Sequence, residues 1–283
     1  MPELPEVETI VRGLRTKVIE QDVVTVDILR EDLLATPRRA FVMAVSGRRI
    51  VDVSRRGKNI VIALASGGER VGFLVINLGM TGRLLRLGPG EASALLTHPG
   101  ARFGLGDGST LVYHDIRRFG SLTAVRPDEL RDWSASLGPE PLSRAFTRER
   151  FARDLGRSAA RVHPWLLDQT RVAGVGNIYA SEALFRARVH PARRARDLAP
   201  REAHLLHASV RKVLAEAVKG RGTTLRDYRS FEGWEGSYAG KLRVYGRAGR
   251  PCRRCRGILE RVVIGGRSAF FCPGCQPPPD EAP

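Results

Sequence analysis

This sequence of 283 residues has little lysine, few aromatic residues and no long hydrophobic run. Its longest apolar stretch, VGFLVINLGM, is far shorter than the roughly 18 residues that a membrane-spanning helix requires. The first fifteen residues are acidic and lack the apolar segment of a secretory signal. We therefore expect no membrane association and a cytoplasmic location.

Cysteine is also scarce, and its four residues all lie between positions 252 and 275. This confinement argues against a disulfide framework for the whole chain. The order is Cys252-x2-Cys255, sixteen intervening residues, then Cys272-x2-Cys275, which is typical of a structural four-thiolate zinc site. A block this small needs the ion in order to fold securely. A redox dithiol is the alternative.

Acidic residues are in the minority, with 30 Asp and Glu against 47 Lys and Arg and a formal net charge of +17. Such a charge concentrates polyanions and favours nucleic acid as the partner, although general solubility is an alternative explanation. Residues 240–275 hold nine basic residues and one acid, Glu260. This composition suits a finger that contacts a groove or a nucleic-acid backbone, or else a merely solvated surface.

Hydrophobic periodicity predicts several kinds of segment along the chain. Apolar residues at three- and four-residue steps predict an amphipathic helix over 5–20. Seven short β-rich runs fill 22–125 and indicate a sandwich or a barrel, followed by a connector near 127–140. Helical patterns occupy 147–220, before a polar stretch and the cysteine block. We expect an α+β, multidomain protein divided into segments 1–130, 131–239 and 240–276 and a disordered tail, 277–283.

Five motifs occur in order: MPELPEVET at the start, LGMTGRL at 78–84, DIRRFG at 115–120, GVGNIYASEALF at 174–185 and the basic four-cysteine finger. Together they closely resemble the bacterial formamidopyrimidine-DNA glycosylase family over essentially 2–276. The resemblance implies an N-terminal two-sheet β-sandwich with flanking helices, which is the catalytic domain. It further implies a helix–two-turn–helix DNA-binding domain and a C-terminal zinc finger with one structural Zn²⁺.

The implied activity is excision of oxidised purines, such as 8-oxoguanine and formamidopyrimidines, followed by β,δ-elimination at the abasic site. The implied partner is damaged double-stranded DNA, bound by a monomer. Two alternatives stay open. An endonuclease VIII-like enzyme would prefer oxidised pyrimidines, and a non-catalytic DNA binder would keep the scaffold without the chemistry.

The resemblance implies covalent catalysis at the N-terminus. Removal of Met1 exposes Pro2 as a secondary amine that attacks the anomeric carbon of the sugar, and an α-amine titrates well below a lysine. Glu3 is implied as the acid and base, with a helix-flanking role as the alternative. Lys58, one of only five lysines, is implied near the lesion and its phosphate, with surface solubility as the alternative. Arg267 completes the implied catalytic set because its side chain can reach a phosphate.

Other residues match the DNA-binding set of the family. Met80, Arg117 and Phe119 are implied to fill the void that the extracted base leaves, with Arg117 bonding to the orphaned cytosine. Without the resemblance, Met80 and Phe119 would be interpreted as core residues. Asn177 lies at a glycine-flanked turn before a helix, where backbone N–H groups can face a phosphate.

The polar stretch RGTTLRDYRSFEG at 221–233 matches a loop that closes over the flipped purine. Thr223, Thr224 and Tyr228 are the lesion contacts that this match suggests. The sequence departs from the family pattern at two candidate DNA contacts. Asn77 stands where histidine is frequent, and His163 stands where lysine is common.

Overall fold

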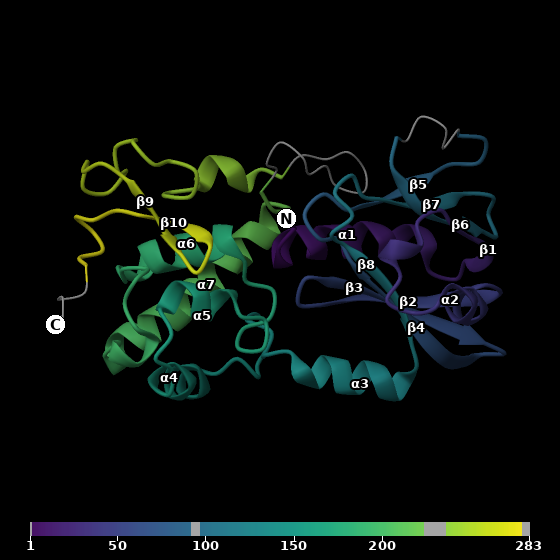
Figure 1. The fold of residues 1–283 in the computed structure, drawn as a ribbon, viewed down its shortest axis with the longest axis horizontal. Coiled ribbons are helices and arrows are strands. Elements are labelled where there is room, and N and C mark those ends of the chain that lie inside the picture. Colours follow the sequence, from purple (N-terminus) through teal and green to yellow (C-terminus); the bar gives the residue numbers. More distant parts are fainter. Residues whose placement is uncertain (1, 92–96, 224–235, 279–283) are drawn as a thin grey trace. The chain divides into compact units, whose positions relative to one another are not determined.

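The computed structural model describes residues 2–91, 97–223 and 236–278 (Figure 1). By their internal contacts these residues form two compact units. Unit 1 comes from Met1–Ser136 and Arg221–Gly236, and unit 2 comes from Leu137–Gly220 and Ser237–Pro283. Each unit has its own hydrophobic core, so each is described separately.

Unit 1 is built on an eight-stranded ladder in the order β5-β7-β6-β1-β2-β3-β4-β8, with every neighbouring pair antiparallel. Its strands are β1 Asp22–Ile28, β2 Arg48–Arg56, β3 Asn59–Ser66, β4 Glu69–Asn77, β5 Arg83–Leu87, β6 Pro99–Leu105, β7 Thr110–His114 and β8 Ser121–Val125. Side chains from both halves of the ladder line one apolar core, among them Ile62 of β3 and Phe103 of β6. The expected two-sheet β-sandwich is confirmed. A short pairing of β1 with β2 joins its sheets.

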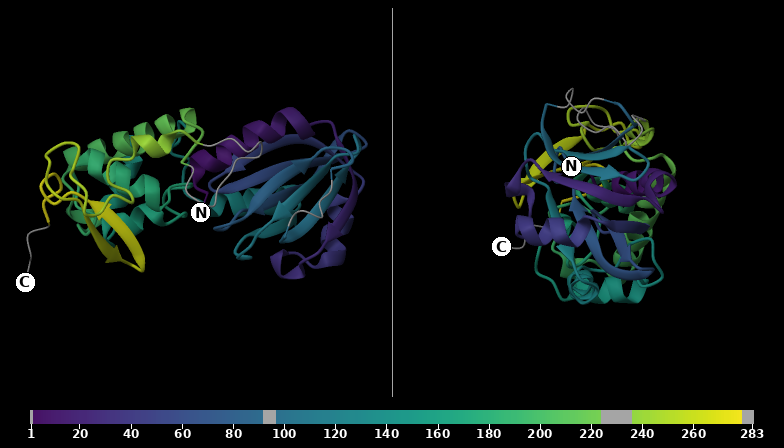
Figure 2. Two further views of the ribbon diagram at one scale, coloured as in Figure 1. Left: turned by 90° about the horizontal axis from the view of Figure 1, so that it is seen from above. Right: turned by 90° about the vertical axis from the view of Figure 1, so that its right-hand side faces the viewer.

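Helix α1, Leu4–Val18, packs along β2 and β3 (Figure 2). Its apolar residues are buried at the three- and four-residue spacing that the sequence predicted, and they belong to the sandwich core from Val7 onward. Pro5 lies in the first helical turn, where its missing N–H costs no hydrogen bond. The predicted helix is confirmed, and its position fixes the start of the chain against the sheet.

Four elements of unit 1 were missed in the sequence: β6, η1 (Glu31–Leu33), α2 (Arg38–Val45) and α3 (Pro127–Ser136). In β6, Gly100 and Gly104 interrupt the apolar pattern. Glycine is needed at both positions, because a Cβ would collide with Leu33 at Gly100 and with Thr25 at Gly104. Helix α3 lies where we expected a connector. It has no buried residue, and therefore no apolar face that periodicity could reveal.

Unit 2 is helical. Its elements are α4 Arg148–Gly156, α5 Val162–Leu167, α6 Asn177–Ala187, η3 Ala195–Asp197, α7 Pro200–Lys219 and η4 Tyr238–Lys241, followed by β9 Glu260–Ile264 and β10 Arg267–Phe271. The buried helix α6 packs against α7, α5 and β10. A small core joins Phe185 of α6 to Cys252 and Cys272, so the finger and the helices share apolar contacts.

Strands β9 and β10 form an antiparallel hairpin in which Ile264 pairs with Arg267. Gly265 and Gly266 form its turn with positive φ angles of 58° and 73°, which glycine adopts without strain. No helix of the described ranges is long and apolar enough to cross a membrane.

Candidate active site and nucleic-acid interface

The N-terminal residues are fixed in the structure rather than frayed. Pro2 is buried, and Glu3, only 2% exposed, is the N-cap of α1 with extended backbone angles. The backbone N–H of Glu3 donates to Glu6 Oε2 at 2.9 Å. A nitrogen at position 2 is therefore held in a defined place beside a buried carboxyl group.

Glu6 also connects this terminus to the segment that precedes residues 224–235. Its Oε1 accepts a hydrogen bond from the backbone N–H of Thr223 at 2.7 Å. Gly222 has a φ of +81°, and a Cβ there would lie 2.6 Å from Glu6 Oε1. Thr223 is 2% exposed, whereas Thr224 and Tyr228 lie outside the described residues. The sequence around Glu6 gives no sign of this second contact, because its partner lies 217 residues away.

Lys58 lies in the tight turn between β2 and β3 and is half-buried. Arg55 holds this turn, because its Nη1 donates to Gly57 O at 2.9 Å while its Nε donates to Glu8 Oε2 at 3.1 Å. Burial opposes ionisation of Glu8, but hydrogen bonds and charges from Arg12 and Arg55 leave its pKa below the usual value. An ionised Glu8 on α1 thus ties the Lys58 turn to the N-terminal helix.

Met80 and Phe119 lie on two adjacent exposed loops. Met80 is 36% exposed and Phe119 is 59% exposed, so their interpretation as core residues is wrong. The guanidinium carbon of Arg117 lies 4.8 Å from the centroid of the Phe119 ring, within range of a cation–π contact. The structure therefore brings Arg117 and Phe119 together at the surface.

Asp115 links these two loops through its buried carboxylate. Oδ1 accepts from the Thr81 hydroxyl at 2.6 Å and from the Arg117 N–H at 3.3 Å. Oδ2 accepts from the Gly120 N–H at 2.9 Å and lies 3.4 Å from the Tyr113 hydroxyl. Burial, together with the nearby Asp115 charge, raises the pKa of Tyr113 far above its usual value, so this phenol stays protonated. Sequence reasoning quoted the motif around Asp115 but gave this residue no role.

Asn77 has a structural role in the loop that carries Met80. Its Oδ1 accepts from the Gly79 N–H at 2.8 Å, and its Nδ2 donates to Asn59 Oδ1 at 2.8 Å. Asn59 pairs with Asn77 across β3 and β4 and directly follows Lys58. Only one of the two amide hydrogens of Asn77 remains for the DNA contact that we expected.

In unit 2, Asn177 is the first residue of α6, after a turn that Gln169 holds in place. Gln169 Oε1 accepts from the Gly174 N–H at 2.8 Å, and its Nε2 donates to Val175 O at 2.9 Å. Asn177 Nδ2 donates to Ser268 O at 2.9 Å, directly beside the exposed Arg267 on β10. The structure thus brings these two predicted residues to one place.

His163 is placed differently from our expectation. Its side chain is fully buried in α5, so this conformation gives DNA no access to the ring. Burial lowers its pKa to about 4, against a smaller opposing effect of the Asn177 side chain. We therefore withdraw His163 as a direct DNA contact: it is a neutral packing residue beneath Asn177.

The four cysteines meet at one point of the finger. Their sulfur atoms all lie within 4.8 Å of one another, and those of Cys255 and Cys272 are 3.4 Å apart. Four thiolates at about 2.3 Å from a central ion produce separations of this size, so the set fits Zn²⁺ and leaves no open coordination position. The predicted ligands, Cys252, Cys255, Cys272 and Cys275, are thus assembled for a structural ion.

Comparison with family models gives three matches that follow one another along the chain. The formamidopyrimidine-DNA glycosylase N-terminal domain matches residues 1–122, and the H2TH domain of the same family matches 137–228. A zinc finger found in FPG and IleRS matches 249–278. The chain belongs to the formamidopyrimidine-DNA glycosylase family.

Members of the formamidopyrimidine-DNA glycosylase family match the chain over its length. The protein of Thermus thermophilus is 47% identical over 98% of both chains, and that of Heliobacterium modesticaldum is 45% identical over 98% of this chain and 100% of its own. The resemblance inferred from the five motifs is therefore confirmed.

Solved structures agree. The crystal structure of the MutM (Fpg) protein from Thermus thermophilus is 44% identical, with a TM-score of 0.86 over 97% of this chain and 98% of its own. Lactococcus lactis Fpg in complex with abasic-site DNA is 30% identical, with a TM-score of 0.90 over 98% and 100% of the chains. Its wild-type complex with DNA containing N7-benzyl-Fapy-dG is 31% identical, with the same TM-score and coverage.

Proposed function

We propose that this chain is a bifunctional DNA glycosylase and abasic-site lyase that removes oxidised purines, including 8-oxoguanine and formamidopyrimidines, from duplex DNA. The observation that carries the proposal is the N-terminal Pro2–Glu3 pair, buried and fixed at the start of α1 in a member of this family. Segment 1–130 supplies the chemistry, and segments 131–239 and 240–276 bind DNA. Because each chain carries the whole set of groups, we propose that it acts as a monomer on the bacterial chromosome in the cytoplasm.

Pro2 is the nucleophile once Met1 has been removed. Its nitrogen attacks C1′ of the damaged nucleotide, and the electron pair of the bond to the base leaves with the base. The proton that the Pro2 nitrogen loses passes to the departing base. Glu3 protonates the ring oxygen as the sugar opens, which leaves an iminium cation between C1′ and Pro2. The cation acidifies the neighbouring C2′ hydrogen, which passes to the Glu3 carboxylate as the 3′ phosphate leaves. Loss of the C4′ hydrogen to solvent then expels the 5′ phosphate. Water finally releases Pro2.

Lys58 and Arg267 supply positive charge to the phosphates and assist the departing groups. The Lys58 turn is suited to this task because Arg55 and Asn59 hold its backbone. Arg267 follows the hairpin turn of the finger, beside the carbonyl that Asn177 binds. When bound by the four cysteines, Zn²⁺ supplies folding energy rather than reaction chemistry.

Met80, Arg117 and Phe119 occupy the void in the duplex after the base has been extruded. Their exposure on two loops joined by Asp115 supports this role, because a wedge must stand out from the surface and yet hold its position. Asn177 and Arg267 bind the DNA backbone in unit 2. Hydrogen bonding of Arg117 to the base that has lost its partner also accounts for the expected preference for cytosine opposite the lesion.

Borohydride trapping on a duplex with 8-oxoguanine opposite cytosine tests the reaction. We expect a covalent protein–DNA adduct whose peptide map places the nucleotide on Pro2, and no adduct from Pro2→Gly. A non-catalytic DNA binder forms none with either protein. The same assay on duplexes that contain oxidised pyrimidines tests the substrate class. Faster excision of oxidised pyrimidines than of 8-oxoguanine would contradict the proposal.

A further inference from the structure

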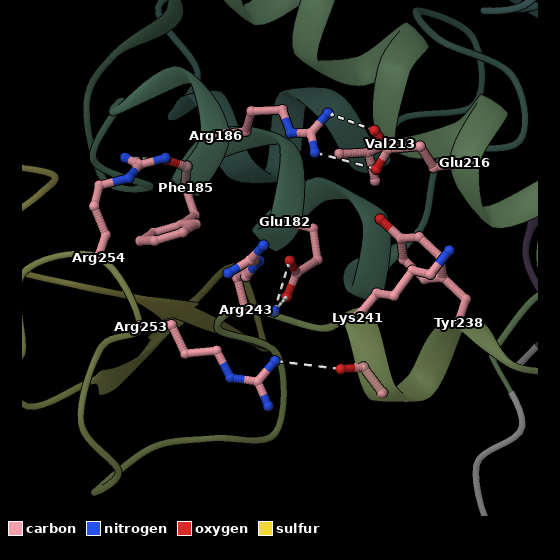
Figure 3. A pocket seen from close by; sticks show the side chains of 11 residues that line it. Glu182, Phe185, Arg186, Val213, Glu216, Tyr238, Lys241, Arg243, Arg253 and Arg254 are labelled. Atoms are coloured by element: carbon pink, nitrogen blue, oxygen red, sulfur yellow. Dashed lines mark hydrogen bonds and ion pairs between the residues drawn. The ribbon is translucent and has the colours of Figure 1, made fainter.

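An open cavity of about 600 Å³ lies within unit 2, and none of its lining residues has a role in the function proposed above (Figure 3). Its walls come from the C-terminal half of α6, from α7, from residues 238–243 and from the first cysteine knuckle of the finger. The lining is rich in cations, namely Arg186, Lys241, Arg243, Arg253 and Arg254. This cavity therefore differs in composition from an apolar ligand site.

Both carboxylates of the cavity already have partners. Glu182 accepts hydrogen bonds of 2.9 to 3.0 Å from the consecutive backbone N–H groups of residues 243, 244 and 245. Glu216 accepts two parallel bonds of 3.1 Å from the guanidinium of Arg186. Neither carboxylate forms an ion pair with the side chains of Lys241, Arg253 or Arg254, so the charge of these three cations is available to a ligand.

Two of these cations are held in place by backbone oxygens. Arg253 Nη1 donates to Gly240 O at 3.2 Å, and Arg254 Nη1 donates to Phe185 O at 3.3 Å. The Arg254 guanidinium also lies 4.4 Å from the centroid of the Phe185 ring. A guanidinium has five N–H groups, so each arginine retains donors after these contacts. Burial and repulsion from Arg253 and Arg250 lower the pKa of neighbouring Arg247, as expected where cations gather.

Guanidinium and ammonium donors whose neighbouring carboxylates are already hydrogen-bonded suit a tetrahedral oxyanion. We propose that this cavity is a second phosphate-binding site, in whose lining Lys241, Arg243, Arg253 and Arg254 are the available donors. Arg186 lies nine residues beyond Asn177 on α6, or about 14 Å along the helix axis. The phosphate in this cavity is therefore not the one that Asn177 contacts. It belongs either to another part of a DNA backbone or to a free phosphate.

The double variant Lys241→Ala/Arg253→Ala tests the site in the full-length, zinc-loaded protein. Its matched control is Lys17→Ala/Arg39→Ala, which removes the same charge from exposed positions of unit 1. Binding to a long duplex with a tetrahydrofuran abasic analogue is measured by anisotropy at several salt concentrations. Loss of one phosphate contact is expected to reduce the slope of log K against log salt by about 0.9 in the double variant only.

Equilibrium dialysis with radiolabelled inorganic phosphate, without DNA, forms the second arm. Saturable phosphate binding that the double variant loses and the control keeps supports a site for free phosphate. A change in salt slope alone supports a DNA backbone phosphate. Equal behaviour of the two double variants in both arms overturns the proposal. If the double variant loses zinc, the single variant Lys241→Glu, at an exposed side chain, replaces it in the same comparison.

Single-turnover excision with saturating enzyme separates this inference from the proposed reaction. The phosphate site lies outside the groups assigned to catalysis, so the double variant retains Pro2 trapping and base release. Absence of a trapped adduct with the wild-type protein would instead contradict the proposed reaction and leave the phosphate site unaffected.

Discussion

The carboxylate of Glu6 joins two chain segments 217 residues apart by accepting the Thr223 N–H at 2.7 Å, while it also accepts the Glu3 N–H at 2.9 Å. The start of the chain and the base of the 221–223 segment therefore share one buried acceptor. A change in this carboxylate therefore alters the positions of both segments. The arrangement suits a nucleophile that has to be aligned with a sugar carbon.

Glu6→Gln tests that relationship. The amide offers one acceptor oxygen and turns an N–H group toward a backbone N–H, so one hydrogen bond to a charged group is lost. We expect a decrease of about 2 kcal/mol in the free energy of unfolding and roughly a tenfold slower formation of the trapped Pro2 adduct. Urea unfolding and single-turnover trapping measure the two effects. Glu69→Gln, at an exposed position, is the control, and equal trapping rates for both variants would contradict the alignment role.

Asp115→Asn addresses the loops that carry Met80 and Arg117. The amide NH2 replaces one carboxylate oxygen, so two donors lose their acceptor. These are either the Thr81 hydroxyl and the Arg117 N–H or the Gly120 N–H and the Tyr113 hydroxyl. We expect about 2 kcal/mol of destabilisation and slower release of 8-oxoguanine. Cleavage of a preformed abasic site, which requires no base extrusion, should be nearly unchanged.

The comparison of base release with abasic-site cleavage makes the Asp115 result specific. Exposed Asp27→Asn serves as the control and should alter neither rate. Should Asp115→Asn slow both reactions by the same factor, a general loss of structure would explain the result better than loop positioning.

Local signals in the sequence were sufficient for much of this fold. The helix at the N-terminus follows from the spacing of its apolar residues, and the zinc ligands follow from the Cys-x2-Cys pairs. Both patterns are formed by residues that lie close together in the sequence. The missed helix α3 shows the limit of that signal, since a helix without a buried face has no apolar period.

The site was less predictable where partners are distant in sequence. Nothing near Glu6 indicates that Thr223 completes its carboxylate, and the DIRRFG motif does not reveal that Asp115 binds Thr81 across 34 residues. His163 was misplaced for a related reason. Its sequence neighbours permit either an exposed or a buried ring, and only tertiary packing around α5 decides between them.

His163 predicts a specific dependence of stability on pH. Its folded pKa of about 4 lies below the ordinary histidine pKa of 6.5, so the unfolded chain binds this proton more readily. Stability from the neutral ring is present above pH 6.5 and falls as the pH decreases toward 4, by on the order of 3 kcal/mol in total. Denaturant unfolding of the wild type and His163→Leu at pH 7 and pH 5 measures this difference. An equal loss of stability in both proteins would contradict it.

Removal of zinc is expected to disrupt DNA binding through unit 2. Cys252 and Cys272 share a core with Phe185, so loss of the ion exposes α6 as well as the β9–β10 hairpin that carries Arg267. Metal analysis should give one zinc per chain, and Cys272→Ser should lose the ion and weaken duplex binding at least tenfold. Hydrogen exchange should rise in residues 252–275 and around Phe185, while the α1 core of unit 1 stays protected. Unchanged exchange after zinc removal would show that the finger folds without the metal.

Met80→Ala tests whether Met80 fills the vacated base stack as a wedge or stabilises the fold as a core residue. Met80 is 36% exposed and Met43 is 65% exposed, so truncation of either side chain should change the free energy of unfolding by no more than about 0.5 kcal/mol. Only Met80→Ala should slow the release of 8-oxoguanine, by about tenfold, because it removes an apolar group that fills the vacated stack. Single-turnover excision, compared with thermal unfolding of the same proteins, measures both properties. A matching loss of excision in Met43→Ala, or a large loss of stability in Met80→Ala, would contradict the wedge.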